Sequence, residues 1–151
     1  MKTTATRFRL LALPGLACAL AAVLACSRTG VPLPLAGDPA RGHYLVEQVG
    51  MCQDCHTPRD DEGQFDRSRW LQGAAIPFQP TAPMPWAPAS AYIAGLPTLT
   101  DQQAVTFLTS GELPGHRRPR PPMPDYRLDQ RDALDVVAYL RSLGKPEAPA
   151  R

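Results

Sequence analysis

The chain has 151 residues, which is enough for one ordinary domain but not comfortably for two. Its 18 prolines and few aromatic residues argue against a large core made of protein side chains alone. We therefore expect a disulfide, a metal or a cofactor to stabilise the fold. The formal net charge is +2, but Lys2, Arg7 and Arg9 lie at the extreme N-terminus. Without them thirteen basic side chains stand against fourteen acidic ones, so the charge does not indicate a nucleic-acid partner.

The N-terminus has the pattern of an export signal. A basic start is followed by an apolar run over residues 10–25, which is short for a membrane span and is interrupted by Pro14. Residues 23–25 followed by Cys26 resemble the lipobox of bacterial lipoproteins, in which the cysteine becomes the acylated first residue. We expect residues 1–25 to be a signal peptide and Cys26 to carry the lipid anchor. Ordinary cleavage that leaves a soluble periplasmic protein, and an uncleaved anchor, are the alternatives.

The first helix is expected after a tether at residues 26–36. Asp38 and Pro39 are typical of a helix start, because proline at the first helical position gives up no hydrogen bond. Gly50 is expected to end the helix. Small or apolar residues recur along it at helical spacing, namely Gly42, Leu45, Val46 and Val49.

Residues 59–98 have no sustained periodicity and are rich in proline, which forbids a long helix and interrupts any central strand. A long irregular segment in a compact domain is usually functional or disordered. We expect it to wrap a buried cofactor, because it holds apolar residues that do not suit a free linker, namely Trp70, Ile76, Phe78 and Trp86.

Two further helices are predicted near the C-terminus. Thr100 and Gln103 have the spacing of a capping box, and Gly111 ends this helix. The last helix is expected over residues 130–143. Since no region is rich in strand signals, the fold class is predicted to be all-α, with one domain over residues 37–145 and a flexible tail over 146–151.

The motif that carries chemistry is formed by Cys52, Cys55 and the adjacent His56, the attachment pattern of c-type haem. Residues three and four apart share a helix face, so both thiols can reach the vinyl groups of one porphyrin, and His56 then lies beneath the iron. A thioredoxin-like dithiol would need alternating strands and helices, and a zinc site would need further paired ligands. A disulfide here would close almost no loop. One covalently attached haem c is therefore the expected cofactor.

The chain resembles the class I cytochrome c family over residues 37–144. The motif follows an apolar helix, and Met123 followed by Pro124 precedes the terminal helix. The resemblance implies a cytochrome c fold, with three to four helices around the haem and a long proline-rich loop. In that family the first and last helices cross with a small residue against an aromatic one, for which Gly42 and Tyr139 are the matching pair.

The resemblance also implies the second axial ligand. In the family it is a methionine shortly before the last helix, where Met123 stands. Met84, His116 and an open site are the alternatives. Family members fix the haem histidine through a proline carbonyl in a Pro-x-Leu-x-Gly segment. Leu71 and Gly73 match the end of that pattern, but Arg69 stands where the proline would be.

The expected function is one-electron transfer in a bacterial envelope chain, with a periplasmic dehydrogenase or a terminal oxidase as partner. Two protein ligands on the iron leave no place for a small-molecule substrate, so the chain is predicted not to be an enzyme. The alternative is a peroxide- or gas-binding enzyme or sensor with an open sixth position. Six further side chains have two possible roles each. The two tryptophans, Trp70 and Trp86, either contact the haem or pack within the protein. The loop arginines either contact a partner beside the haem edge or are solvated charges: Arg117, Arg118, Arg120 and Arg127.

Overall fold

The structure, a computed structural model, describes residues 36–144. The predicted signal peptide (1–25), Cys26 with nearly all of the tether, and the predicted tail (146–151) lie outside the described residues. Within the described range the chain forms these helical elements in order: α2 (Pro39–Tyr44), the π-helix η2 (Leu45–Val49), α3 (Gln53–His56), the 3₁₀ turn η3 (Arg67–Arg69), α4 (Asp101–Ser110) and α5 (Gln130–Leu143).

The prediction of an all-α fold is confirmed. Between residues 36 and 144 the only β geometry is found in isolated bridging pairs, such as Ala75 with Ala89. The longest helix in this range is α5, with 14 residues, and no helix of the described part has the length and apolar character needed to cross a bilayer.

The first predicted helix is present as α2 followed directly by η2. The Asp38 side chain accepts a hydrogen bond from the backbone N–H of Ala40 at 2.9 Å, and Pro39 takes the first helical position, as expected. The helix ends at Gly50, whose N–H donates to the carbonyl of Leu45 at 2.7 Å. This wider final turn was not expected, because apolar periodicity does not distinguish an i+4 from an i+5 hydrogen bond.

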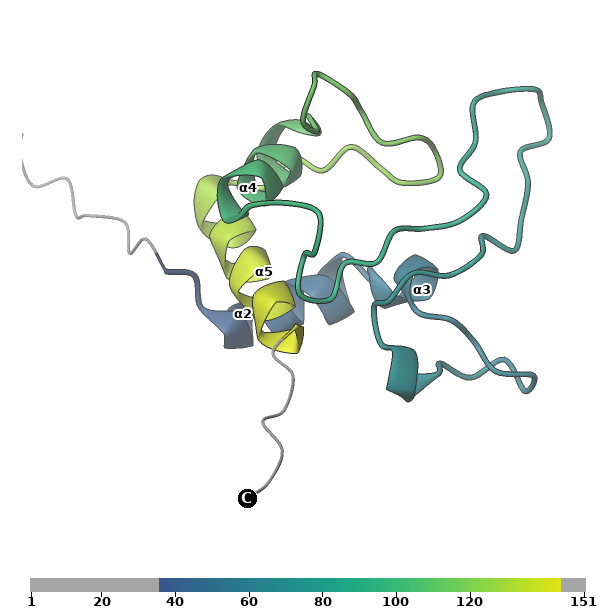
Figure 1. Cartoon of the computed structure of the whole chain (residues 1–151), viewed down its shortest axis with the longest axis horizontal. Coiled ribbons are helices and arrows are strands. Elements are labelled where there is room, and N and C mark those ends of the chain that lie inside the picture. The colour runs from purple at the N-terminus through teal and green to yellow at the C-terminus, as the bar shows by residue number, and fades with distance from the viewer. Residues whose placement is uncertain (1–35, 145–151) are drawn as a thin grey trace, which may run out of the picture. The chain divides into compact units, whose positions relative to one another are not determined.

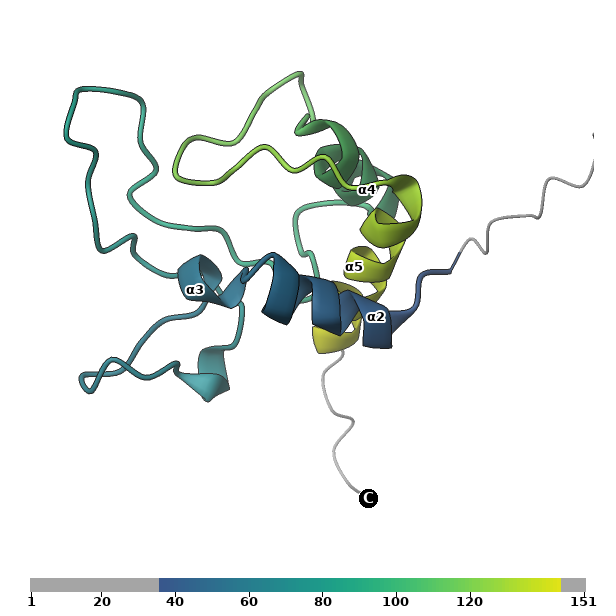
Figure 2. The same cartoon turned by 180° about the vertical axis from the view of Figure 1, so that it is seen from behind.

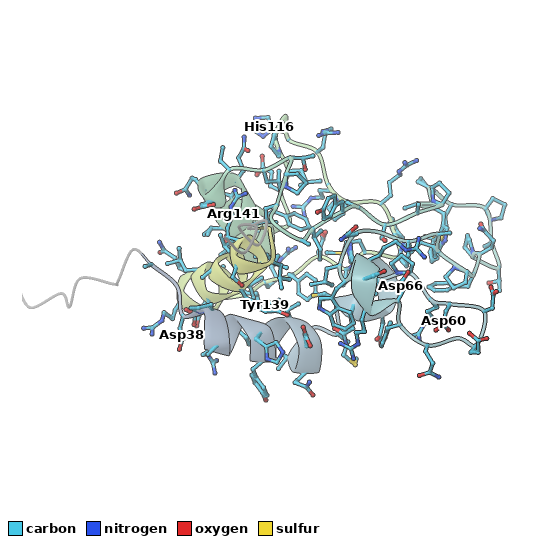
Figure 3. All side chains as sticks on the ribbon, turned by 60° about the horizontal axis from the view of Figure 1, so that its bottom comes forward. Asp38, Asp60, Asp66, His116, Tyr139 and Arg141 are labelled. Carbon is cyan, nitrogen blue, oxygen red and sulfur yellow. The ribbon has the colours of Figure 1, made fainter. Side chains whose placement is uncertain are left out.

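The crossing of α2 over α5 is visible from both sides (Figures 1 and 2). Gly42 makes it possible, since a Cβ atom there would overlap the backbone carbonyl of Asp135 and lie 2.8 Å from the Cβ of Tyr139. Tyr139 lies between the two helices (Figure 3) and donates its hydroxyl to the carboxylate of Glu47. The predicted pairing of Gly42 with Tyr139 is therefore confirmed.

Helices α4 and α5 pack against each other and complete the core. The capping box is present: the Thr100 hydroxyl accepts from the Gln103 N–H at 3.2 Å, and the Gln103 side chain accepts from the Thr100 N–H at 2.9 Å. Gly111 ends α4 with a left-handed backbone at φ 73°. The buried apolar core comes from η2, α4, α5 and three residues of the irregular segment before α4: Leu45, Val46, Leu71, Ala94, Leu96, Ala104, Val105, Ala133, Val136, Val137, Tyr139 and Leu140.

Two irregular segments leave this core. The first, residues 77–87, is named the proline loop; hydrogen bonds close its base, including the Ile76 N–H to the Pro88 carbonyl at 2.9 Å. The second, residues 111–128, joins α4 to α5 and is named the methionine loop. The two loops are linked by the Ala87 N–H, which donates to the carbonyl of Pro121 at 2.8 Å.

Candidate functional site

Cys52, Cys55 and His56 lie on one helical turn. Cys52 precedes α3, and the His56 N–H donates to the Cys52 carbonyl at 2.9 Å. The turn is joined to the first helix because the Cys52 N–H donates to the carbonyl of Val46 at 2.9 Å. Both cysteine side chains are partly buried, and they do not form a disulfide with each other. Their spacing of three residues places the two sulfur atoms on the same side of the turn.

The imidazole of His56 is oriented for ligation. The residue is 7% exposed, and its Nδ1 lies 2.7 Å from the carbonyl oxygen of Ala91. Since a carbonyl can only accept a hydrogen bond, Nδ1 carries the proton and Nε2 keeps its lone pair. Burial lowers the pKa of His56 against the opposing effect of the Ala91 hydrogen bond, which favours the neutral ring that binds a metal.

The acceptor for this histidine differs from the one suggested by the resemblance. The segment with Leu71 and Gly73 does contact the histidine, but through the backbone: the Gly73 N–H donates to the His56 carbonyl at 2.7 Å. Leu71 in turn accepts from the N–H of Ile93 at 2.9 Å. Leu71 is thus hydrogen-bonded to the segment that follows the proline loop, and that segment supplies Ala91.

The thiols do not have the properties of a redox dithiol. Burial raises the pKa of the Cys52 thiol to about 11, whereas reactive Cys-x-x-Cys motifs have a lowered pKa. Within residues 36–144 no three His, Cys, Asp or Glu side chains are grouped so that they could hold a metal ion by themselves. The thioredoxin-like and zinc alternatives therefore gain no support from the part of the chain that the structure describes.

Met123 lies in the methionine loop and is partly buried. The two alternative ligands are in more open positions. Met84 is 49% exposed in the proline loop, and the side chain of His116 is 94% exposed. His116 projects at the far edge of the methionine loop (Figure 3), where its Nδ1 is hydrogen-bonded to Glu112.

The arginines of the methionine loop are partly engaged within the loop. Arg118 pairs with Asp125 at 2.9 Å, and Arg127 lies 3.6 Å from the same carboxylate. Arg117 donates to the carbonyl of Pro114 at 3.1 Å. All three arginines are exposed, so the loop presents positive charge to solvent while Asp125 compensates part of it.

The two tryptophans donate to protein groups. Trp70 Nε1 donates to the Glu47 carboxylate at 3.0 Å, and Trp86 Nε1 donates to the carbonyl of Phe78 at 3.2 Å. The Phe78 and Trp86 rings also meet edge to face at 5.8 Å between centroids. Both indole N–H groups are therefore used within the protein in this structure.

The donor set fits a covalently attached haem. Two thiols on one turn match the two vinyl groups of a porphyrin, and a buried neutral imidazole with Nε2 available matches an axial iron ligand. A thioether in a separate loop is a suitable soft second ligand. The backbone bonds that position His56, including Ala91, were not identifiable from sequence, because no side-chain pattern marks a carbonyl acceptor.

Comparisons with known proteins agree with this chemistry. The family model described as cytochrome c matches residues 40–144. A protein named diheme cytochrome c-type from Cereibacter sphaeroides is 54% identical over 43 residues, which cover 28% of this chain and 14% of that protein. A protein named fructose dehydrogenase cytochrome subunit from Gluconobacter japonicus is 32% identical over 109 residues, covering 68% of this chain and 21% of that protein. The chain thus spans about a fifth or less of the length of these curated relatives.

Proposed function

Because the chain belongs to the cytochrome c family, we propose that it carries one haem c and acts as a one-electron carrier. Cys52 and Cys55 would hold the haem through thioether bonds, and His56 and Met123 would be the protein ligands of its iron. The main support for this proposal is the geometry of one helical turn. Both thiols lie on it beside His56, whose Nδ1 is held by the Ala91 carbonyl.

The bound haem supplies an iron that changes its charge by one electron. The residues of the chain set the conditions for that change. Ala91 orients the His56 ring and leaves Nε2 for the iron. Met123 offers a neutral thioether, a soft ligand that favours the reduced state and raises the potential. Since neither ligand has to leave, electron transfer needs little rearrangement.

The same ligand pair argues against an enzyme. With both His56 and Met123 as ligands, the haem iron would have no position left for peroxide, a gas or another small-molecule substrate. The alternative with an open sixth site is tested by adding carbon monoxide to the reduced protein. We expect slow and incomplete binding; immediate stoichiometric binding would favour the open-site alternative.

The assignment of Met123 is tested by substitution. Met123→Ala is expected to abolish the sulfur-to-iron absorption band in the far red and to lower the midpoint potential, because the soft ligand is lost. Met84→Ala is the matched control, since Met84 also precedes a proline. If Met84→Ala removes the band and Met123→Ala retains it, Met84 is the ligand.

We propose a protein redox partner of the dehydrogenase or terminal oxidase type. The support is the match to a chain whose name is that of a dehydrogenase cytochrome subunit, over two thirds of this chain. Rapid reduction of the ferric protein by a membrane fraction supplied with the substrate of a periplasmic dehydrogenase would agree with this role. A haem that exchanges electrons with no envelope fraction would indicate a structural role instead.

We further propose export and lipid anchoring through Cys26 on the periplasmic side of a bacterial membrane. The support is the sequence pattern of residues 1–26. Cys26→Ser is expected to move the protein from the membrane to the soluble periplasmic fraction if cleavage still occurs. Continued membrane association with an intact N-terminus would indicate an uncleaved anchor.

A further inference from the structure

Tyr126 connects the methionine loop to the segment that carries the first attachment cysteine. It lies three residues after Met123, and its hydroxyl donates to the backbone carbonyl of Gly50 at 3.1 Å. The two residues are 76 positions apart in the chain. Gly50 ends η2 and is followed by Met51 and Cys52, so one hydrogen bond joins the two segments that would lie on either side of the haem.

The surroundings of this hydroxyl place it next to the attachment sulfur. A Cβ atom at Gly50 would lie 3.3 Å from Cys52 Sγ and 3.4 Å from the Tyr126 hydroxyl oxygen. Burial, together with the nearby Cys52, raises the pKa of Tyr126 to about 12. A phenol is protonated near neutral pH even at its ordinary pKa, so this hydroxyl is a hydrogen-bond donor.

The stretch that holds Met123 is also fixed on its other side. The Pro121 carbonyl, two residues before Met123, accepts from the Ala87 N–H at 2.8 Å. Around Pro121 the chain makes a short turn, in which the Met123 N–H donates to the Arg120 carbonyl at 3.3 Å. Met123 is thus enclosed by one long-range hydrogen bond before it and one after it.

We propose that Tyr126 is a positioning residue whose hydrogen bond to Gly50 keeps the methionine loop closed and so retains Met123 on the iron. The inference rests on the proposed role of Met123 as the second ligand. An added ligand can reach the iron only when Met123 leaves and the loop opens. The apparent affinity of the ferric protein for such a ligand therefore reports the opening equilibrium of the loop.

The test is a titration of the ferric holoprotein with imidazole, followed by absorbance. Tyr126→Phe removes only the hydroxyl and is expected to raise the apparent imidazole affinity by about two- to tenfold, the factor that corresponds to one net neutral hydrogen bond. Tyr44→Phe is the matched control, because Tyr44 is 52% exposed on α2, and it is expected to leave the affinity unchanged.

A double-substitution cycle tests whether the effect passes through Met123. Met123→Ala alone is expected to bind imidazole far more tightly than the natural chain, and adding Tyr126→Phe to it is expected to change nothing further. An equal effect of Tyr126→Phe with and without Met123 would overturn the positioning role. So would a lower denaturation midpoint of Tyr126→Phe with an unchanged imidazole affinity, since that is the result of a purely structural contact.

The failure of this inference is distinguishable from the failure of the ligand assignment. If Met123→Ala has the spectrum and imidazole affinity of the natural chain, Met123 is not the ligand, and both proposals are overturned. If Met123→Ala opens the site and Tyr126→Phe behaves as the natural chain, the ligand assignment stands and only the role of Tyr126 is rejected.

Discussion

Where the first helix and α5 cross, the two backbones lie close together beside the buried apolar core, with polar contacts such as Arg41 to Asp132 at the edge. The methionine loop is held mainly by hydrogen bonds and exposed ion pairs, with Leu128 partly buried against the core. The buried apolar core contains residues of η2, α4 and α5, such as Val46 and Leu140, and includes no residue of the described loop 111–128. The loop is linked elsewhere through groups such as the Tyr126 hydroxyl and the Pro121 carbonyl.

The difference between the two regions means that each governs a different free energy, one of global unfolding and one of local loop opening. Removing buried packing lowers the free energy of global unfolding, because the core forms as one cooperative unit. Removing a hydrogen bond from a loop with few buried contacts changes mainly a local opening equilibrium. If Met123 binds the iron as proposed, its loop belongs to the second category. Substitutions in the two regions should therefore be distinguishable by which free energy they change.

The largest effect is expected at the helix crossing. Gly42→Val should lower the free energy of unfolding by about 3 kcal/mol or prevent folding, because its side chain would overlap the Asp135 carbonyl. Ala40→Val, at an exposed position of the same helix, is the control and should cost well under half as much. Chemical denaturation followed by circular dichroism measures both. Equal effects of the two substitutions would show that the crossing is not close-packed.

A smaller effect is expected beside His56. Thr57 is 1% exposed, and its hydroxyl accepts from the Leu71 N–H at 3.0 Å. Thr57→Val keeps the shape but leaves that buried N–H without its partner, which should cost about 2 kcal/mol in unfolding. Thr106→Val, on the exposed side of α4, tests whether the change of residue type alone has a cost. A Thr57→Val protein as stable as the natural chain would contradict this assignment.

The smallest effect on unfolding is expected in the methionine loop. Arg118 pairs with Asp125 at 2.9 Å, and both side chains are well exposed, at 56% and 41%. Arg118→Ala should therefore lower the free energy of unfolding by less than about 1 kcal/mol, and high salt should remove most of that difference. Thermal denaturation at low and high salt measures it. A loss as large as that of Thr57→Val would place the loop within the cooperative core.

The sequence predicts the helical region better than the loop because periodic and capping patterns act over short distances. Asp38 and Thr100 each mark a helix start that the structure contains, whereas the contact of Gly42 with Tyr139 was implied by the family resemblance. The hydrogen bonds of Ala91, Ala87 and Tyr126 join residues 34 to 76 positions apart. All three end on a backbone carbonyl, a group that every residue carries, so no residue type marks the acceptor in advance. The same limit explains why η2 and the Ala91 acceptor were not predicted.

The account depends on one haem held by both Cys52 and Cys55. The most direct measurement is the intact mass of the protein recovered from the periplasmic side of its host, read together with its absorption spectrum. The mass is predicted to exceed that of the processed chain by one haem, plus any lipid on Cys26, and the haem should resist extraction by acidic organic solvent. A colourless protein with two free thiols at these positions, or a mass with no haem or with more than one, would contradict the account.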